Sequence, residues 1–185
     1  MTQPTRAEVL KVKAEADCLY TAAEIDAALA RMASAITLRL AQVAPLVLVA
    51  MTGGLVPSAL LLRLLDFPLQ VDYFHATRYG AATSGGQLQW IRRPPANVAG
   101  RTVLIVDDLL DHGLTLQAAV EECRRLDAAE VLTAVLVIKE IVDRPGLKTT
   151  DFHALTTPDR YLFGYGMDYK SFWRNGSGLY AVNGV

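Results

Sequence analysis

Continuous runs of apolar residues mark three segments of the chain, at residues 46–50, 103–106 and 131–138. A strand with one solvent-facing side alternates apolar and polar residues, whereas a strand covered on both faces is apolar throughout. The three segments are therefore predicted to be central strands of a parallel sheet between layers of helices. A glycine-containing turn and a helix-forming segment follow the first two strands, at residues 57–65 and 115–126. This alternation predicts right-handed crossovers in an open α/β fold.

The amino-terminal part has the periodicity of helices instead. Thr21 and Glu24 have the spacing of a capping box, and the apolar residues that follow recur on one helical face. Residues 6–42 are therefore expected to be helical. The apolar face comprises Ile25, Leu29, Met32, Ile36 and Leu40.

The remaining segments predict shorter elements. Residues 69–79 and 87–93 are strand-like, and the glycine-rich residues 80–86 between them predict a long hairpin loop. Internal repeats, low-complexity tracts and a linker are all absent from the sequence, so residues 1–185 are expected to form one domain. Further short strands are predicted around residues 152–155 and 161–166.

Composition narrows the class of protein. Of 185 residues, 52% are apolar and the net charge is −1, which is typical of a globular protein with a real core. Balanced charge disfavours a large sequence-independent nucleic-acid surface. Cys18 and Cys123 are far apart and are expected to be reduced, buried thiols. The polar amino terminus resembles no signal peptide, so a cytoplasmic location is expected.

One uncharged stretch, residues 45–62, has about the length of a membrane span. Gly53, Gly54 and Pro57 interrupt it. A buried strand, a tight turn and a helix explain this pattern better than a membrane helix.

The stretch "VLIVDDLLDHGLTL", residues 103–116, carries the strongest chemical signal. Asp107 and Asp108 follow a buried strand, at the end where open α/β sheets bind ligands. Adjacent carboxylates there must be solvated, paired, or supplied with hydroxyl donors or a metal. A ribose diol supplies two hydroxyl donors, and Mg²⁺ is the other natural partner of such carboxylates.

The residues that follow favour a phosphate site. Gly113 permits a positive φ, and backbone N–H groups at the start of the next helix, with the Thr115 hydroxyl, can cradle a phosphate. The stretch lacks the lysine of a nucleotide triphosphatase P-loop. An acidic strand end and a helix cap without any ligand is the alternative, which the combination of features makes less favourable.

The same stretch resembles the phosphoribosyl pyrophosphate (PRPP) signature of type I phosphoribosyltransferases, and Asp111 resembles their hypoxanthine-guanine branch. Four further stretches resemble that branch in the same order, so the resemblance covers residues 46–182. It implies an open, mainly parallel, twisted, Rossmann-like α/β sheet flanked by helices. It also implies a core at about residues 40–160, a small hood from the N-terminal and C-terminal segments, and a mobile hairpin loop. The four stretches are "AMTGGLVPSALLL", "HATRYG", "VIKE" and "PDRYLFGYGMDYKSFWRN".

By this resemblance, the chain is a Mg²⁺-dependent purine salvage enzyme. It is expected to transfer the phosphoribosyl group of PRPP to hypoxanthine, and also to guanine, releasing pyrophosphate. The family implies a homodimer or homotetramer that needs neither membrane nor nucleic acid. Three alternatives stay open: another 6-oxopurine such as xanthine, a regulatory relative that binds PRPP or nucleotide and RNA, and a phosphate-sugar binding module without turnover.

The resemblance also implies roles for individual residues. Asp111 is expected to be the general base near purine N7, and Asp107, Asp108 and Asp168 to bind Mg²⁺. The ribose and its 5′-phosphate are expected at Asp107, Asp108, Asp111, His112, Gly113, Leu114 and Thr115. Pyrophosphate is expected at Met51, Thr52, Gly53, Gly54 and Arg174, with a cis peptide between Met51 and Thr52. The purine is expected at Lys139, Arg160, Tyr161, Leu162 and Asp168, with Lys139 donating to the 6-oxo group and Tyr161 stacking on the ring.

Residues 77–87, including Arg78 and Tyr79, are expected to form a lid, with an ordinary hairpin loop as the alternative. The sequence departs from the family pattern in two places. Thr52 stands where lysine or arginine is frequent, which weakens the charge expected around pyrophosphate. His112 stands where threonine is common. It is either a titrating donor beside the phosphate or a solvent-facing loop residue.

Overall fold

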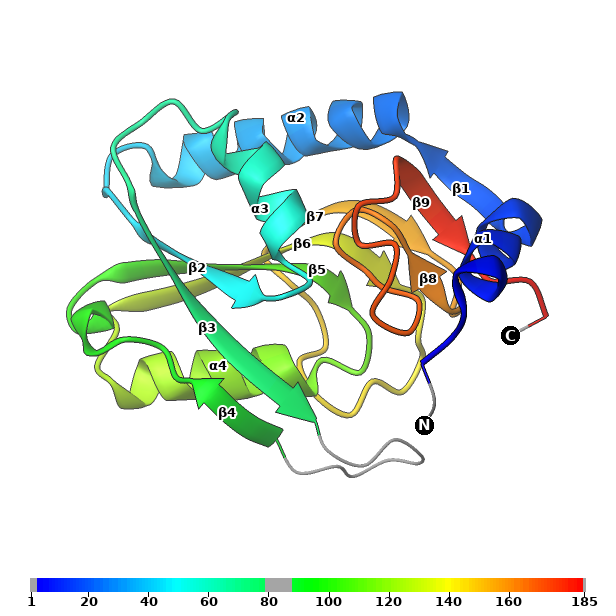
Figure 1. The fold of residues 1–185 in the computed structure, drawn as a ribbon. Coiled ribbons are helices and arrows are strands. Elements are labelled where there is room, and N and C mark those ends of the chain that lie inside the picture. The colour runs from blue at the N-terminus through cyan, green and yellow to red at the C-terminus, as the bar shows by residue number, and fades with distance from the viewer. Residues whose placement is uncertain (1–2, 79–87, 185) are drawn as a thin grey trace.

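A six-stranded sheet forms the centre of the molecule (Figure 1). The computed structural model describes residues 3–78 and 88–184. The strand order is β4-β3-β2-β5-β6-β7; β4 runs antiparallel to β3, and the other neighbours are parallel. The expected open, mainly parallel sheet is therefore confirmed. Its strands are β2 (Leu46–Met51), β3 (Gln70–Arg78), β4 (Leu88–Arg92), β5 (Thr102–Leu110), β6 (Glu130–Lys139) and β7 (Phe152–Thr157).

Helices cover both faces of this sheet, because its central strands are apolar on both sides. Helices α2 (Ala22–Leu40) and α3 (Leu55–Leu62) pack on one face, and α4 (Leu114–Arg125) packs on the other (Figure 1). Each face has its own cluster of buried apolar side chains. The five predicted apolar positions of α2 are all buried, and the capping box at its start is present.

Two parts of the chain differ from the prediction. Residues 6–42 are not helical throughout, because α1 (Arg6–Glu15) ends at the extended residue Ala16 and β1 (Asp17–Thr21) follows. Cys18 lies on this edge strand and is exposed, whereas Cys123 is buried in α4, where burial raises its thiol pKa to about 11.

Strand β1 belongs to a second, three-stranded antiparallel sheet, here called the hood. Its order is β1-β9-β8, with β9 at Gly178–Ala181 and β8 at Leu162–Phe163. The hood joins the two ends of the described chain, and it lies over one end of the central sheet (Figure 1). It therefore brings carboxy-terminal residues above the carboxyl ends of the central strands.

Strand β5 is longer than its apolar run. The pairs Leu109–Val137 and Leu110–Ile138 continue its ladder with β6, so Asp107 and Asp108 lie within the strand rather than after it. A short 3₁₀ turn at Ala96–Val98 precedes β5. The ladder fixes the backbone on both sides of the two carboxylates.

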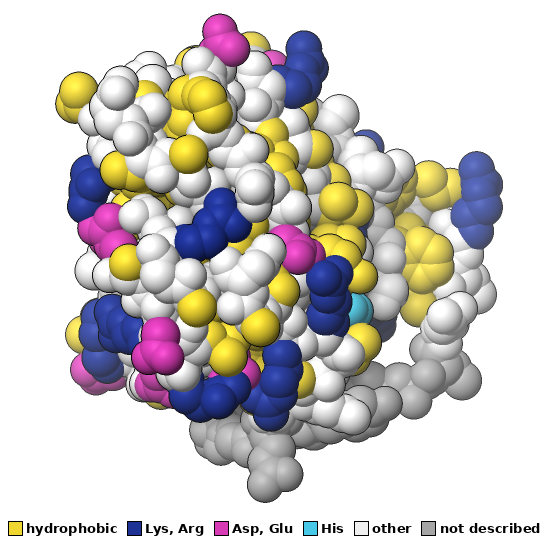
Figure 2. All heavy atoms as spheres, turned by 90° about the vertical axis from the view of Figure 1, so that its left-hand side faces the viewer, with side chains coloured by type: hydrophobic (Ala, Val, Ile, Leu, Met, Phe, Trp, Pro, Cys, Tyr) yellow, Lys and Arg dark blue, Asp and Glu magenta, His cyan; other side chains and the backbone are white. Residues whose placement is uncertain are grey.

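Residues 45–62 form β2, a turn and α3, as predicted. In the two described ranges, none of the helices combines the length and the apolar character needed to cross a membrane. On the face shown in Figure 2, Lys and Arg side chains are interspersed with Asp and Glu side chains. The predicted hairpin loop falls at residues 79–87, outside the described residues.

A buried carboxylate, that of Glu122, fastens α4 to the segment after β4 through partly exposed arginines. The Glu122 carboxylate is 8% exposed and lies 3.1 Å from Arg93 Nη1 and 2.8 Å from Arg125 Nη2. Hydrogen bonds from Arg125 are the largest cause that lowers the pKa of Glu122 from 4.5 to about 2. The charged form of Glu122 therefore stabilises the folded state.

Replacing Glu122 by Gln is expected to lower the free energy of unfolding at pH 7 by about 1–2 kcal/mol, because charge-assisted hydrogen bonds are lost. The folded pKa lies below the unfolded pKa, so this stabilisation is complete well above pH 4.5 and is lost as the pH falls toward 2. Urea unfolding at pH 7 and pH 3 measures the difference between wild type and variant. A difference that does not shrink at pH 3 would contradict the assignment. Exposed Glu121→Gln is the control and should change little at either pH.

Candidate active site

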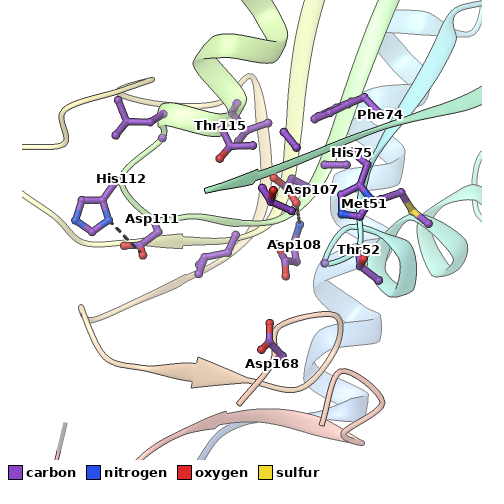
Figure 3. A pocket seen from close by; sticks show the side chains of 18 of the residues that line it. Met51, Thr52, Phe74, His75, Asp107, Asp108, Asp111, His112, Thr115 and Asp168 are labelled. Atoms are coloured by element: carbon purple, nitrogen blue, oxygen red, sulfur yellow. Dashed lines mark hydrogen bonds and ion pairs between the residues drawn. The ribbon is translucent and has the colours of Figure 1, made fainter. Parts of the chain in front are cut away.

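A cavity of about 400 Å³ opens where β2, β3 and β5 end, beside the start of α4 (Figure 3). Parallel strands bring their carboxyl ends to one edge, so segments distant in sequence meet there. The lining residues are Ala50, Met51, Thr52, Gly53, Phe74, His75, Ala76, Thr77, Asp107, Asp108, Leu109, Asp111, His112, Gly113, Leu114, Thr115, Leu116, Asp168 and Arg174.

Asp107 and Asp108 form the floor of this cavity. They lie between Thr52 on one side and Asp111 on the other, and Asp168 faces them (Figure 3). The Asp108 N–H donates to Asp107 Oδ1 at 2.9 Å. Burial raises the pKa of Asp107 well above its usual range, with the charge of Asp108 as a second cause, and burial also raises the pKa of Asp108. Hydroxyl donors or a cation would therefore relieve a real electrostatic cost here.

The turn into α4 has the shape of a phosphate cradle. Gly113 has φ +75°, and a Cβ there would lie 2.4 Å from the Leu147 carbonyl oxygen. Residues Asp111 to Thr115 all line the cavity at the amino end of the 12-residue α4. Unpaired N–H groups and the helix dipole at such an end favour an anion.

His112 lies at the outer rim of this turn, with its side chain 63% exposed. Its Nδ1 atom is 3.4 Å from Asp111 Oδ2, so it faces the Asp111 carboxylate (Figure 3). The exposed ring agrees with the interpretation of His112 as a solvent-facing loop residue. His112 also lines the cavity, so its role as a donor beside the phosphate stays a prediction.

The turn after β2 forms the opposite wall. The Met51–Thr52 peptide bond is cis, as expected. A Cβ on Gly53 would lie 2.2 Å from Asp108 Oδ2, so only glycine permits this approach to the acidic floor. Gly54 packs against the carbonyl oxygens of Ala50 and Val106 and is not part of the cavity lining.

Arg174 brings positive charge to this wall from the carboxy-terminal segment. Its Nη2 lies 2.5 Å from Asp168 Oδ1, and its Nη1 donates to the Gly166 carbonyl at 2.6 Å. The Ser171 N–H also donates to Asp168, at 2.6 Å. Both Arg174 and Asp168 line the cavity, and their expected roles in binding stay predictions.

A second cavity, of about 210 Å³, adjoins the first. Asp108, Leu109, Asp111 and Asp168 line both cavities, so the acidic residues stand at their boundary. The other residues that line the second cavity are Lys139, Tyr161, Leu162 and Met167.

Lys139 and Asp111 meet at this boundary. The Lys139 side chain is 9% exposed, and its Nζ lies 3.4 Å from Asp111 Oδ1 and 3.2 Å from Asp159 Oδ1. Asp111 Oδ1 is buried, yet it accepts no hydrogen bond of good geometry from any residue that the structure describes. A polar ligand atom between Lys139 and Asp111 would therefore find a donor on one side and an acceptor on the other.

The structure places Arg160 away from the predicted purine site, whereas Tyr161 lies in the second cavity. The Arg160 guanidinium turns to the hood, 2.7 Å from Asp17 Oδ2 and within 3.0 Å of the Val182 carbonyl, and it lines neither cavity. Tyr161 lines the second cavity and makes an edge contact with Tyr169. Tyr79, predicted for the lid, lies outside the described residues, and Arg78 ends β3.

Sequence reasoning missed several residues of the site. Phe74, His75 and Ala76 of β3 line the first cavity, and Asp159 approaches Lys139. Strand β3 was predicted, but its alternating pattern does not reveal which of its residues end beside the acidic floor. Asp159 lies inside the stretch "PDRYLFGYGMDYKSFWRN", directly before Arg160, and this position was the available signal.

A ready-made metal cage is absent from the described part of the chain, where three or more potential ligands do not converge. Mg²⁺ usually takes one or two carboxylates and completes its shell with water and substrate phosphates. The paired carboxylates of Asp107 and Asp108, with their raised pKa values, fit that mode of binding.

A family model described as "Phosphoribosyl transferase domain" matches residues 16–170. This chain belongs to the phosphoribosyltransferase family. The hypoxanthine-guanine phosphoribosyltransferase of Bacillus subtilis (strain 168) is 33% identical over 132 residues, covering 71% of this chain and 73% of that protein. The hypoxanthine-guanine-xanthine phosphoribosyltransferase of Tritrichomonas foetus is 28% identical over 157 residues, covering 85% and 86%.

Solved structures agree with this membership. A variant hypoxanthine phosphoribosyltransferase from Trypanosoma cruzi, in a ternary complex with substrates, is 26% identical and has a TM-score of 0.82, covering 92% of this chain and 97% of that one. A hypoxanthine phosphoribosyltransferase from Staphylococcus aureus has a TM-score of 0.85 at 23% identity, covering 96% of each chain, and supports the fold. The resemblance seen in the sequence is confirmed.

The requirement for glycine at position 113 of this phosphoribosyltransferase can be tested by measuring the free energy of unfolding. Gly113→Ala is expected to lower the free energy of unfolding by about 1–2 kcal/mol for the left-handed φ. About 1–3 kcal/mol more is expected for the collision with Leu147. Gly100→Ala is the matched control, because Gly100 has φ +69° with nothing within 4 Å of the added Cβ. Equal losses in the two variants, measured by urea unfolding, would show that the collision has no effect.

Proposed function

We propose that this phosphoribosyltransferase transfers the 5-phosphoribosyl group of PRPP to hypoxanthine and to guanine, forming IMP or GMP and pyrophosphate. The observation that carries the proposal is the pair of adjoining cavities with Asp108 and Asp111 at their boundary. PRPP fits the first cavity, which has an acidic floor and a phosphate cradle. A flat base with polar edges fits the second, where apolar side chains such as Tyr161 and Leu162 stand beside charged ones such as Lys139.

In the PRPP cavity, the 5′-phosphate lies at residues 111–115, where backbone N–H groups and the Thr115 hydroxyl donate to it. The ribose hydroxyls donate to Asp107 and Asp108. Pyrophosphate lies against residues 51–53, near the positive charge of Arg174. Thr52 adds no charge to this wall, so Arg174 is the main cationic group in our assignment.

In the base cavity, Tyr161 stacks on the purine and Leu162 contacts its edge. The Lys139 ammonium donates to the 6-oxo group, which favours hypoxanthine and guanine over adenine. Asp159 and Asp111 hold that ammonium near the cavity wall, 3.2 Å and 3.4 Å away. The Arg160 side chain contributes to the base site indirectly, because it joins the segment before β8 to Asp17 of β1 within the hood.

In the reaction, a purine nitrogen forms a bond to C1 of the ribose while the bond from C1 to the pyrophosphate oxygen breaks. Positive charge develops on the ribose as pyrophosphate leaves. Asp111 accepts the proton from purine N7, because its carboxylate lines both cavities and its Oδ1 accepts no hydrogen bond of good geometry from the described residues. The Asp107 and Asp108 carboxylates stabilise the positive charge on the ribose.

Mg²⁺, bound with PRPP, would neutralise the leaving pyrophosphate. Asp107 and Asp108 are the residues proposed to hold it, and Asp168 stands across the cavity as a further carboxylate. We also propose a cytoplasmic enzyme that works as a homodimer or homotetramer. The printed name of the Tritrichomonas foetus relative includes xanthine, which makes xanthine the first further base to test.

The direct test is to mix the protein with PRPP and Mg²⁺ and to follow pyrophosphate release with each base separately. We expect turnover with hypoxanthine and guanine, and none with adenine. Xanthine decides between a two-base and a three-base enzyme. Failure of both hypoxanthine and guanine would refute the proposal and would favour a binding or regulatory relative.

Asp111→Asn is expected to lower kcat by about 10²–10⁴-fold, the usual contribution of a general base. The amide keeps the size of the side chain, so the KM for PRPP should change by less than about threefold. Steady-state kinetics at saturating hypoxanthine separates the two quantities. Equal losses in kcat and in PRPP affinity would make Asp111 a binding residue rather than a base.

A further inference from the structure

A buried arginine outside both cavities contacts the backbone of the two residues that meet at their boundary. Arg144 lies in the loop between β6 and β7 and is 6% exposed. Its Nε donates to the Asp111 carbonyl at 2.5 Å, and its Nη2 donates to the Lys139 carbonyl at 2.6 Å. Its Nη1 donates to the Lys148 carbonyl at 2.6 Å.

These contacts come from one rigid group. A guanidinium is planar and presents its N–H donors in a fixed fork, so it fixes the distance between the carbonyl groups that it joins. Burying a cation among neutral carbonyls carries a desolvation cost that apolar packing would avoid. The stability of the loop alone therefore does not account for arginine at this position.

The same loop also supports the phosphate cradle from behind. The Gly146 N–H donates to the His112 carbonyl at 2.9 Å, and the Leu147 N–H donates to the Gly113 carbonyl at 3.1 Å. A Cβ on Gly146 would lie 2.4 Å from the Gly113 carbonyl carbon, so the two turns touch backbone to backbone. We call residues 144–147 the clamp.

We infer that Arg144 is a positioning residue, which fixes the distance between the Asp111 carboxylate and the Lys139 ammonium. It also helps to hold the phosphate cradle in its binding shape. The Asp111 and Lys139 side chains are 3.4 Å apart, and both line the base cavity. Arg144 acts on them only through their carbonyl groups. The inference rests on the proposed function, which assigns the proton acceptor to Asp111 and the 6-oxo donor to Lys139.

Replacing Arg144 by Leu is expected to lower kcat by about 10–100-fold, since a displacement of about 1 Å at a reacting group can cost that much. The KM values for PRPP and for hypoxanthine should both rise, because the cradle and the lysine are released together. The kcat and KM values of Arg144→Lys should lie between those of Arg144→Leu and wild type, since an ammonium cannot bridge three carbonyls in one plane. Val142→Ala, in the same loop and 98% exposed, is the control and should leave all three constants unchanged.

Chemical rescue separates positioning from folding. Millimolar guanidinium added to Arg144→Ala should restore several-fold of the lost kcat, and methylammonium, which lacks the planar fork, should restore none. Glu122→Gln calibrates the effect of lost stability on turnover, because Glu122 lines neither cavity. Constants for Arg144→Leu within twofold of wild type would overturn the inference. The inference would also be overturned if Arg144→Leu lowered kcat no more than Glu122→Gln does, when the two variants lower Tm by the same amount.

One measurement does not require turnover. Hydrogen exchange of the amides at residues 111–115 should be faster in Arg144→Leu than in wild type, and unchanged exchange would refute the clamp. If Arg144→Leu does not fold, Arg144→Lys and the rescue of Arg144→Ala decide the question. If wild type neither turns over nor binds IMP, the proposed function fails, and the exchange measurement still tests the clamp.

Discussion

The parallel pairing of β5 between β2 and β6 is the constraint on which the site depends. It requires strands that are apolar on both faces, and it brings their carboxyl ends to one edge. Met51, Asp107 and Lys139 reach that edge from segments far apart in the sequence. Because the ladder continues past the carboxylates to Leu110, the backbone at Asp107 and Asp108 cannot move to relieve their burial. The electrostatic cost of the floor is therefore built into the sheet.

Polar groups around this floor divide into two kinds. Asp111 lines both cavities and has only two distant partners, Lys139 and His112, each 3.4 Å from its carboxylate. Asp168, in contrast, is closely engaged by Arg174 and by the Ser171 N–H. In the absence of an anion, the Arg174 guanidinium is thus already paired with Asp168 and with the Gly166 carbonyl. Binding of pyrophosphate near it would exchange existing contacts for new ones, so its net contribution to affinity is smaller than its charge suggests.

Sequence patterns predicted the central elements well, because burial on both faces leaves continuous apolar runs. Strands β2, β5 and β6, helix α2 and the acidic turn could all be predicted in this way. Edge strand β1 could not, because its residues are only partly buried and its partner β9 lies at the other end of the chain. The length of β5 beyond its apolar run depends on Val137 and Ile138 of a neighbour, which no local pattern contains.

In the site, too, residues within local motifs could be predicted, whereas residues that act through tertiary contacts could not. Motif resemblance named the acids, the phosphate turn and Lys139, whose positions in the chain are fixed relative to strand ends. It gave no sign of Arg144, whose importance lies in three backbone carbonyls from separate segments. It also could not predict the direction of the Arg160 side chain, which pairs with Asp17 on a strand that was not predicted. Side-chain direction at loop ends depends on tertiary partners, not on local composition.

The hood has a consequence for the order in which the protein assembles. Strand β9 must pair with β1, and Trp173 donates a hydrogen bond to the Val9 carbonyl, so contacts from both ends of the chain close this small sheet. Loop closure over such a separation is entropically costly and slow. During synthesis, the central sheet with its acidic floor can fold while the carboxy-terminal strands are still emerging. The carboxy-terminal residues that line the two cavities, Asp168 and Arg174 in the first and Tyr161, Met167 and Asp168 in the second, would thus be added last.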